Sequence, residues 1–102
     1  MLKEVNKQEF LEAKKEGLQL LVFYADWCGP CKMFKSSLEE LSEKDNITVF
    51  RVNIDRDKEF TRENNVLSIP YTNVLVDGEV VEIMQGYKPY DVLKHDLQKF
   101  MK

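Results

Sequence analysis

The residues best suited to chemistry are two cysteines in the segment WCGPCK, residues 27–32. Cys28 and Cys31 are the only cysteines in the 102-residue chain, and two residues separate them. A disulfide across so short a loop constrains little of the unfolded chain, so it is poorly suited to bracing a fold. Two sulfurs at this spacing can instead grip a metal ion or pass electrons by forming and breaking a disulfide.

The metal interpretation is limited by the supply of ligands. A structural zinc site takes about four Cys or His ligands, and this chain has two cysteines and a single histidine, His95, far along the sequence. We therefore expect no metal site. A chance pair of inert core cysteines is a second alternative, because an isolated CxxC is a modest signal. A surrounding βαβ pattern favours redox chemistry over both.

Such a pattern surrounds the pair. The nearly continuous apolar run at 18–25, LQLLVFYA, predicts a buried strand before it. After it, Phe34, Leu38 and Leu41 have the spacing of one helix face. The cysteines are therefore predicted at a helix N-terminus, where unpaired N–H groups and the helix dipole favour an anion such as a thiolate.

This placement predicts different roles for the two sulfurs. Cys28, outside the first turn, should be the exposed nucleophile that attacks a substrate disulfide, and Cys31, one turn deeper, should be shielded and resolve the mixed disulfide. Pro30 has a fixed φ that suits a helix start and stiffens the turn. Gly29 permits close approach of a partner backbone.

The rest of the chain predicts an α/β fold with elements in the order β-α-β-α-β-α-β-β-α. A capping box at Asn6 and Glu9 predicts a helix that runs until Gly17, and Asp77-Gly78 predicts a hairpin. A last helix is expected from Pro89 onward. Strands joined through helices should be parallel, giving one mixed sheet of about five strands with helices on both faces. We expect a single domain, residues 1–102, since no linker or repeat interrupts it.

Composition excludes several classes of function. The net charge is −3 and the charges are interspersed, so no basic face for nucleic acid is expected. No apolar run approaches the roughly 20 residues of a membrane helix. The start of the chain, MLKEVNKQEF, has no hydrophobic signal core. We therefore predict a cytoplasmic protein, with nothing that demands more than a monomer.

Four features together resemble the thioredoxin family over Met1–Lys102: WCGPCK after a buried strand, SIP at 68–70, the Asp77-Gly78 hairpin and Gly86 in QGY. The resemblance implies the thioredoxin fold and a thiol-disulfide oxidoreductase that reduces protein disulfides. It also implies disulfide-containing protein substrates, recharging by an NADPH-dependent thioredoxin reductase, and no bound cofactor. The Gly-Pro pair between the cysteines favours a reductase over an oxidase or isomerase variant.

The resemblance also assigns residues around the cysteines. It implies that Pro70 is cis beside the disulfide and that the backbone of Ile69 pairs with an extended substrate segment. The implied docking surface around Cys28 is apolar and consists of Trp27, Gly29, Pro30, Ile69, Pro70 and Gly86. Lys32 completes the active-site motif. Trp27 has an alternative interpretation as a core aromatic residue.

Two positions depart from the family pattern. A buried Asp is usual six residues before the first cysteine, and Val22 occupies that place. Arg51 takes the place of an accompanying lysine, and Asp26 does not substitute by position. Val22 removes a candidate proton acceptor for Cys31, so we predict slower resolution than in a typical family member.

The second departure is Tyr71, where the family usually has Thr after the cis-proline. Its ring could shape the substrate-docking surface or lie within the sheet, and the sequence does not separate these alternatives.

Other titratable residues are interpreted as structural. His95 is expected on a solvated helix face. Asp55, Asp57 and Glu59 resemble a loop and helix start, where carboxylates favour the helix dipole. A rival from another class is a binding or assembly subunit that uses the same apolar surface without redox cycling.

Overall fold

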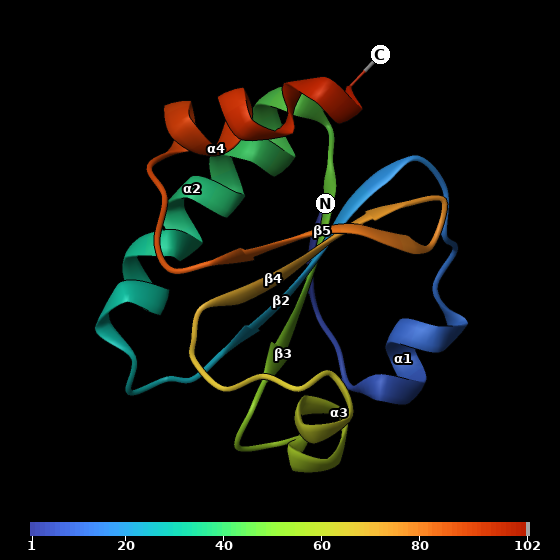
Figure 1. The fold of residues 1–102 in the computed structure, drawn as a ribbon, viewed down its shortest axis with the longest axis vertical. Helices are drawn as coiled ribbons and strands as arrows, with labels where there is room; N and C mark the ends of the chain where they lie inside the picture. Colours follow the sequence, from blue (N-terminus) through green and yellow to red (C-terminus); the bar gives the residue numbers. More distant parts are fainter. Residues whose placement is uncertain (102) are drawn as a thin grey trace.

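The computed structural model describes residues 1–101, and within them the strands form one five-stranded mixed sheet (Figure 1). The strands are β1 (Leu2–Glu4), β2 (Leu18–Tyr24), β3 (Thr48–Asn53), β4 (Tyr71–Val76) and β5 (Glu79–Gln85). Their spatial order is β1-β3-β2-β4-β5. The first three strands run parallel, whereas β4 is antiparallel to both β2 and β5. The predicted mixed sheet is confirmed.

Helices cover both faces of this sheet, as predicted (Figure 1). The four α-helices are α1 (Lys7–Glu12), α2 (Gly29–Asp45), α3 (Lys58–Glu63) and α4 (Tyr90–Leu97), and a 3₁₀ turn follows at Gln98–Phe100. One core cluster joins the sheet to α2 and α4, through residues such as Phe34 and Leu93. The other joins the opposite face to α1 and α3, through Phe10 and Phe60.

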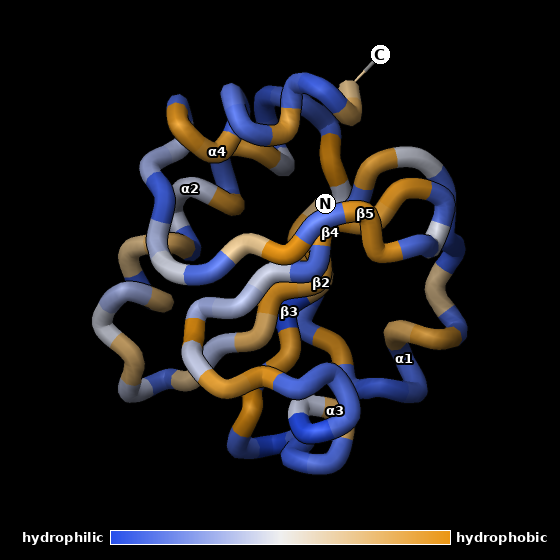
Figure 2. Tube along the Cα trace, viewed as in Figure 1, coloured by the Kyte–Doolittle hydropathy of each residue, from blue (hydrophilic) through white to orange (hydrophobic). Residues whose placement is uncertain are grey.

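Strand β2 is apolar along most of its length because both of its faces are covered. Leu20 and Val22 belong to the cluster under α2 and α4, whereas Leu21 and Phe23 belong to the cluster under α1 and α3. Successive side chains of a strand point to opposite faces, so this alternation follows from the backbone. Figure 2 shows a related contrast in hydropathy, between apolar central strands and a largely hydrophilic α3.

The first helix begins as predicted but ends earlier. Asn6 and Glu9 form the expected capping box. The helix stops at Glu12, and Ala13 is extended, so the prediction that it runs to Gly17 is wrong. Lys15 supplies the physical reason: its Nζ donates hydrogen bonds to the carbonyls of Phe10 and Ala13, satisfying acceptors at the helix end.

The β4–β5 hairpin brings a distant glycine to the sheet end that carries the cysteines. Asp77 and Gly78 both have positive φ, +50° and +87°, as a two-residue type I′ turn requires. After β5, the N–H of Gly86 donates to the carbonyl of Pro70 at 2.9 Å. This bond holds the residue that follows β5 beside Pro70, the residue that precedes β4.

Candidate active site

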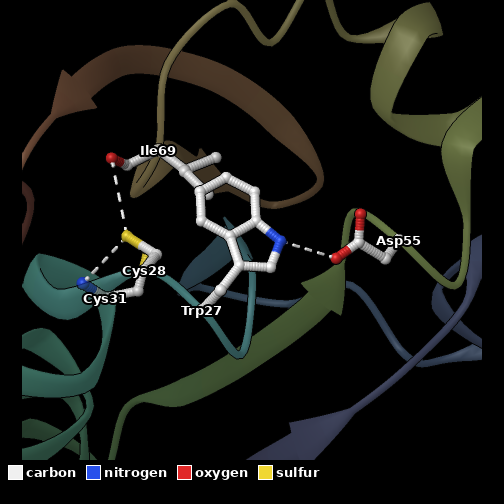
Figure 3. Close-up of a disulfide and its surroundings, with 5 residues drawn as sticks. All are labelled: Trp27, Cys28, Cys31, Asp55 and Ile69. Carbon is white, nitrogen blue, oxygen red and sulfur yellow. Dashed lines mark hydrogen bonds between the residues drawn. A yellow bond between two sulfur atoms is a disulfide. The ribbon is translucent and has the colours of Figure 1, made fainter.

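Cys28 and Cys31 form a disulfide at the N-terminus of α2 (Figure 3). Their Cα atoms are 5.2 Å apart. Cys28 is the N-cap, with extended backbone, and its Sγ accepts the N–H of Cys31 at 3.2 Å. Pro30 lies in the first turn, where its missing N–H removes no helix bond. The predicted placement across a helix N-terminus is confirmed.

The expected contrast in exposure between the two cysteines is wrong for the disulfide form. Cys28 is 6% exposed and Cys31 is 3% exposed. The reason is packing around the turn, where both sulfurs share a small apolar cluster with Ala25 and Ile69. The space beside Gly29 is open, since a Cβ at this position would meet no atom within 4 Å outside the neighbouring residues and the helix backbone.

The loop before β4 lies against Cys28. The Ile69–Pro70 peptide bond is cis, as the resemblance implied. The Ile69 carbonyl oxygen lies 3.9 Å from Cys28 Sγ (Figure 3). Among residues 1–101, no hydrogen bond involves the backbone N–H of Leu67, Ser68 or Ile69. An extended segment laid along this loop would therefore find free donors and an acceptor next to the sulfur.

Trp27 is a surface residue and not a core aromatic. Its side chain is 68% exposed, and the indole Nε1 donates to Asp55 Oδ2 at 2.9 Å. Figure 3 shows the indole directed toward this carboxylate. Asp55 thus orients the indole, a role that its sequence context did not indicate. Asp57 caps α3 and Glu59 lies in its first turn, which agrees with their structural interpretation.

Tyr71 lies in the sheet, as one of its two interpretations held. Its side chain is 7% exposed and packs against Phe23 on the side of α1 and α3. This placement agrees with the interpretation that the ring lies within the sheet, and a contribution of Tyr71 to substrate docking stays a prediction. Lys32 is exposed on α2, and His95 is exposed on α4, as expected for a solvated helix face.

Val22 and Arg51 are neighbours on adjacent strands, paired in the β2–β3 register. Val22 is 1% exposed and belongs to the apolar core. Arg51 is 5% exposed, and its charge is met by Glu4, whose Oε2 lies 3.1 Å from the guanidinium. The guanidinium also lies 3.7 Å from the centroid of the Tyr24 ring. The buried cation is therefore paired without any acid at position 22.

Tyr24 completes this arrangement by donating its hydroxyl to Glu4 Oε1. Burial and the bond to Glu4 raise the pKa of Tyr24 to about 12, so the phenol stays protonated at neutral pH. Sequence reasoning missed Glu4 and Tyr24 here, because no local motif connects β1, β2 and β3.

A residue near the disulfide also escaped the sequence reasoning. Leu67, two positions before Ile69, is 96% exposed. A leucine gains from burial, so one that is almost fully solvated two residues before Ile69, which lies against Cys28, is a candidate contact for a partner. The signal was its position next to SIP, but its exposure is set by the loop conformation.

The thioredoxin family model matches residues 1–99. The chain belongs to the thioredoxin family. It is 40% identical over 96 residues to thioredoxin from Bacillus subtilis (strain 168), covering 92% of each chain. It is 36% identical over 103 residues to thioredoxin from Listeria monocytogenes, covering 99% of this chain and 100% of that one.

Solved structures agree with this membership of the thioredoxin family. Reduced Schistosoma mansoni thioredoxin pre-protein superposes with a TM-score of 0.84 at 30% identity, covering 98% of both chains. A point mutant of thioredoxin from Halobacterium salinarum NRC-1 superposes with a TM-score of 0.89 at 29% identity, covering 99% of this chain and 91% of that one.

Family membership and the Cys28–Cys31 disulfide together show a thiol-disulfide oxidoreductase with protein-disulfide reductase activity. Disulfide-containing proteins are its class of substrate. Across residues 1–101, no cluster of three or more His, Cys, Asp or Glu side chains is arranged to hold a metal ion. In the same part of the chain, no helix is both long and apolar enough to cross a membrane.

Proposed function

We propose that Cys28 and Cys31 carry the reduction as nucleophile and resolving thiol. The Cys28 thiolate attacks one sulfur of a substrate disulfide, and the other substrate sulfur leaves as a thiolate. The Cys31 thiolate then attacks Cys28, forming the intramolecular disulfide and releasing the second substrate sulfur. The observation that carries this assignment is the position of Cys28 as the N-cap of α2, where backbone N–H groups favour its thiolate.

The substrate segment docks on an apolar surface around Cys28. This docking surface consists of Trp27, Gly29, Pro30, Ile69, Pro70 and Gly86. The free backbone groups of Ile69 pair with the extended segment like an added strand. The Ile69 carbonyl oxygen, 3.9 Å from Cys28 Sγ, and the Gly86–Pro70 hydrogen bond support this loop position beside the sulfur. Lys32 supports the site from the exposed face of α2.

The cycle requires an external source of two electrons each time the disulfide forms. An NADPH-dependent thioredoxin reductase supplies them, so that the protein works as an electron carrier in cell redox homeostasis with no bound cofactor. A reducing cytoplasm suits a disulfide that must be opened repeatedly. A monomer suffices, because both sulfurs and the docking surface come from one chain.

The assignment is tested by insulin disulfide reduction with NADPH and a thioredoxin reductase. We expect turnover by the wild type and none by Cys28→Ser. Cys31→Ser should still attack but accumulate a mixed disulfide with insulin, visible by mass spectrometry. Lys44→Gln, at the far end of α2, is the matched control and should turn over normally. Absence of wild-type turnover, or a trapped adduct on Cys31 in place of Cys28, would contradict the assignment.

A further inference from the structure

Cys31 lines a pocket of about 340 Å³ on a side of the active site that the substrate-docking surface does not use. The pocket walls come from three strands and α2, and none of the residues of the docking surface is among them. Its charged members are Glu4, Asp26, Lys32, Lys35 and Arg51, and Tyr24 is its one phenol. Cys31 therefore borders a polar pocket as well as the apolar cluster that it shares with Cys28.

The charges on one wall of this pocket neutralise each other. Glu4 accepts the Tyr24 hydroxyl with one oxygen and pairs with Arg51 through the other. Both oxygens of Glu4 are engaged, and the charge of Arg51 is met. This wall of the pocket therefore contributes little net charge toward Cys31.

The remaining charges are two lysines and one carboxylate. Among residues 1–101, neither Lys32 nor Lys35 forms an ion pair with a carboxylate. Asp26 is exposed, and the Asn53 amide donates to its Oδ2 at 3.4 Å. The net charge of the residues that line the pocket is thus positive.

Lys35 is the better placed of the two lysines. It follows Cys31 by four residues on α2, so the two side chains are neighbours on one helix face. Helix side chains lean toward the N-terminus, which directs the Lys35 stem back over the turn that holds Cys31. Lys32 is adjacent in sequence and lines the same pocket, but points to another part of the helix circumference.

We propose that Lys35, assisted by Lys32, stabilises the Cys31 thiolate across this pocket, in a chain that has no acid at position 22 to accept the proton. This proposal rests on the proposed function, because ionisation of Cys31 matters for catalysis only if Cys31 is the resolving thiol. Lys35 is a positioning residue that acts through charge, because an opposite charge nearby favours the ionised thiol. Asp26 opposes it, and the proton leaves through the pocket to water.

The test is a titration of Cys31 in the reduced Cys28→Ser background, where one thiol remains. Thiolate absorbance near 240 nm is followed against pH. We expect Lys35→Gln to raise the midpoint by about 0.5 pH unit and Lys35→Glu by about 1 pH unit. Asp26→Asn should shift it in the opposite direction. Added salt should shrink each shift, since these charges are exposed.

Lys44→Gln is the matched control, an exposed lysine on the same helix at its other end, and should leave the midpoint unchanged. Far-UV circular dichroism verifies that each variant is folded. Unchanged midpoints in both Lys35 variants would overturn the proposal and leave the helix N-terminus as the source of Cys31 ionisation. The titration uses no substrate, so its failure is distinguishable from failure of insulin reduction.

Discussion

The two sulfurs of one disulfide face different surroundings. Around Cys28 the surface is apolar, with an exposed indole at Trp27 and unpaired backbone groups at Ile69. Cys31 instead lines a pocket with acidic and basic side chains. The sulfurs are covalently joined, yet Cys28 lies beside the proposed docking surface, whereas Cys31 borders a pocket with charged side chains.

This difference teaches how a short motif separates two tasks. Capturing a protein segment needs apolar contact and free backbone hydrogen-bonding groups. Resolving the mixed disulfide needs a thiolate, and therefore a way to lose a proton. In the proposed cycle Cys28 performs the first task and Cys31 the second, so we expect each task to respond to residues on its own side of the turn.

The substitution Val22→Asp, which places an acid on the Cys31 side, is expected to have the largest effect on stability and on the rate of resolution. Val22 is 1% exposed, so a carboxylate there should lower the free energy of unfolding by about 3 kcal/mol at pH 7, even beside Arg51. It should also speed resolution of the mixed disulfide, because it restores a proton acceptor. Urea denaturation and rapid-quench kinetics across neutral pH measure the two effects.

Val22→Asn is the matched control for this substitution. It buries a polar group of similar size that cannot accept the proton as a base. We expect it to be destabilised without faster resolution. Resolution rates that are equal in wild type and Val22→Asp across neutral pH would remove the proposed link between position 22 and Cys31.

A smaller effect on stability is expected from Tyr24, which belongs to the wall of the pocket where Glu4 and Arg51 are paired. The folded-state pKa of Tyr24 is raised to about 12, above the ordinary value of 10.0. Its stabilising contribution is therefore complete below pH 10 and is lost as pH rises through about 12. Because Tyr24 is partly exposed, we expect this loss to be about 1 kcal/mol.

Tyr24→Phe should lack that loss. The measurement is the difference in free energy of unfolding between wild type and Tyr24→Phe, taken from urea denaturation at several pH values from about 9 to about 12, a range that spans the ordinary and the raised pKa. The difference should narrow as pH rises. A constant difference over this interval would show that the bond from Tyr24 to Glu4 does not hold the proton.

The smallest effect belongs to the docking side. Leu67 is 96% exposed, so Leu67→Ser should change the free energy of unfolding by less than about 0.5 kcal/mol. We expect it to raise the KM for insulin about twofold with kcat unchanged, because one apolar contact is lost in binding. Leu11→Ser is the matched control, a leucine 62% exposed on α1. Equal KM values for the two variants would show that Leu67 makes no contact with the substrate.

Local signals predicted much of the scaffold. The capping box at Asn6, the helix face of Phe34 and the Asp77-Gly78 turn each act over a few residues, and each is found in the structure. The end of α1 was mispredicted because Lys15, a side chain outside the helix, satisfies its last carbonyls. The spacing of apolar residues does not reveal a side chain that competes for the carbonyl groups at the helix end.

The family resemblance went further than periodicity at Pro70, whose cis bond no local rule could require. It left two interpretations open at Tyr71, whose neighbours in the structure are core residues from other elements. Burial of a ring depends on what packs over it, and the sequence around Tyr71 leaves that open.

By itself, the sequence determined the chemistry: two cysteines at a spacing that permits a reversible disulfide, on a predicted helix N-terminus. Tertiary structure decided what each sulfur faces. Asp55 holds Trp27 across 28 positions of sequence, and Ile69 lies against Cys28 across 41. Glu4 meets Tyr24 across 20. Such contacts form only when the sheet aligns its strands, because residues distant in sequence share no local pattern that specifies their meeting.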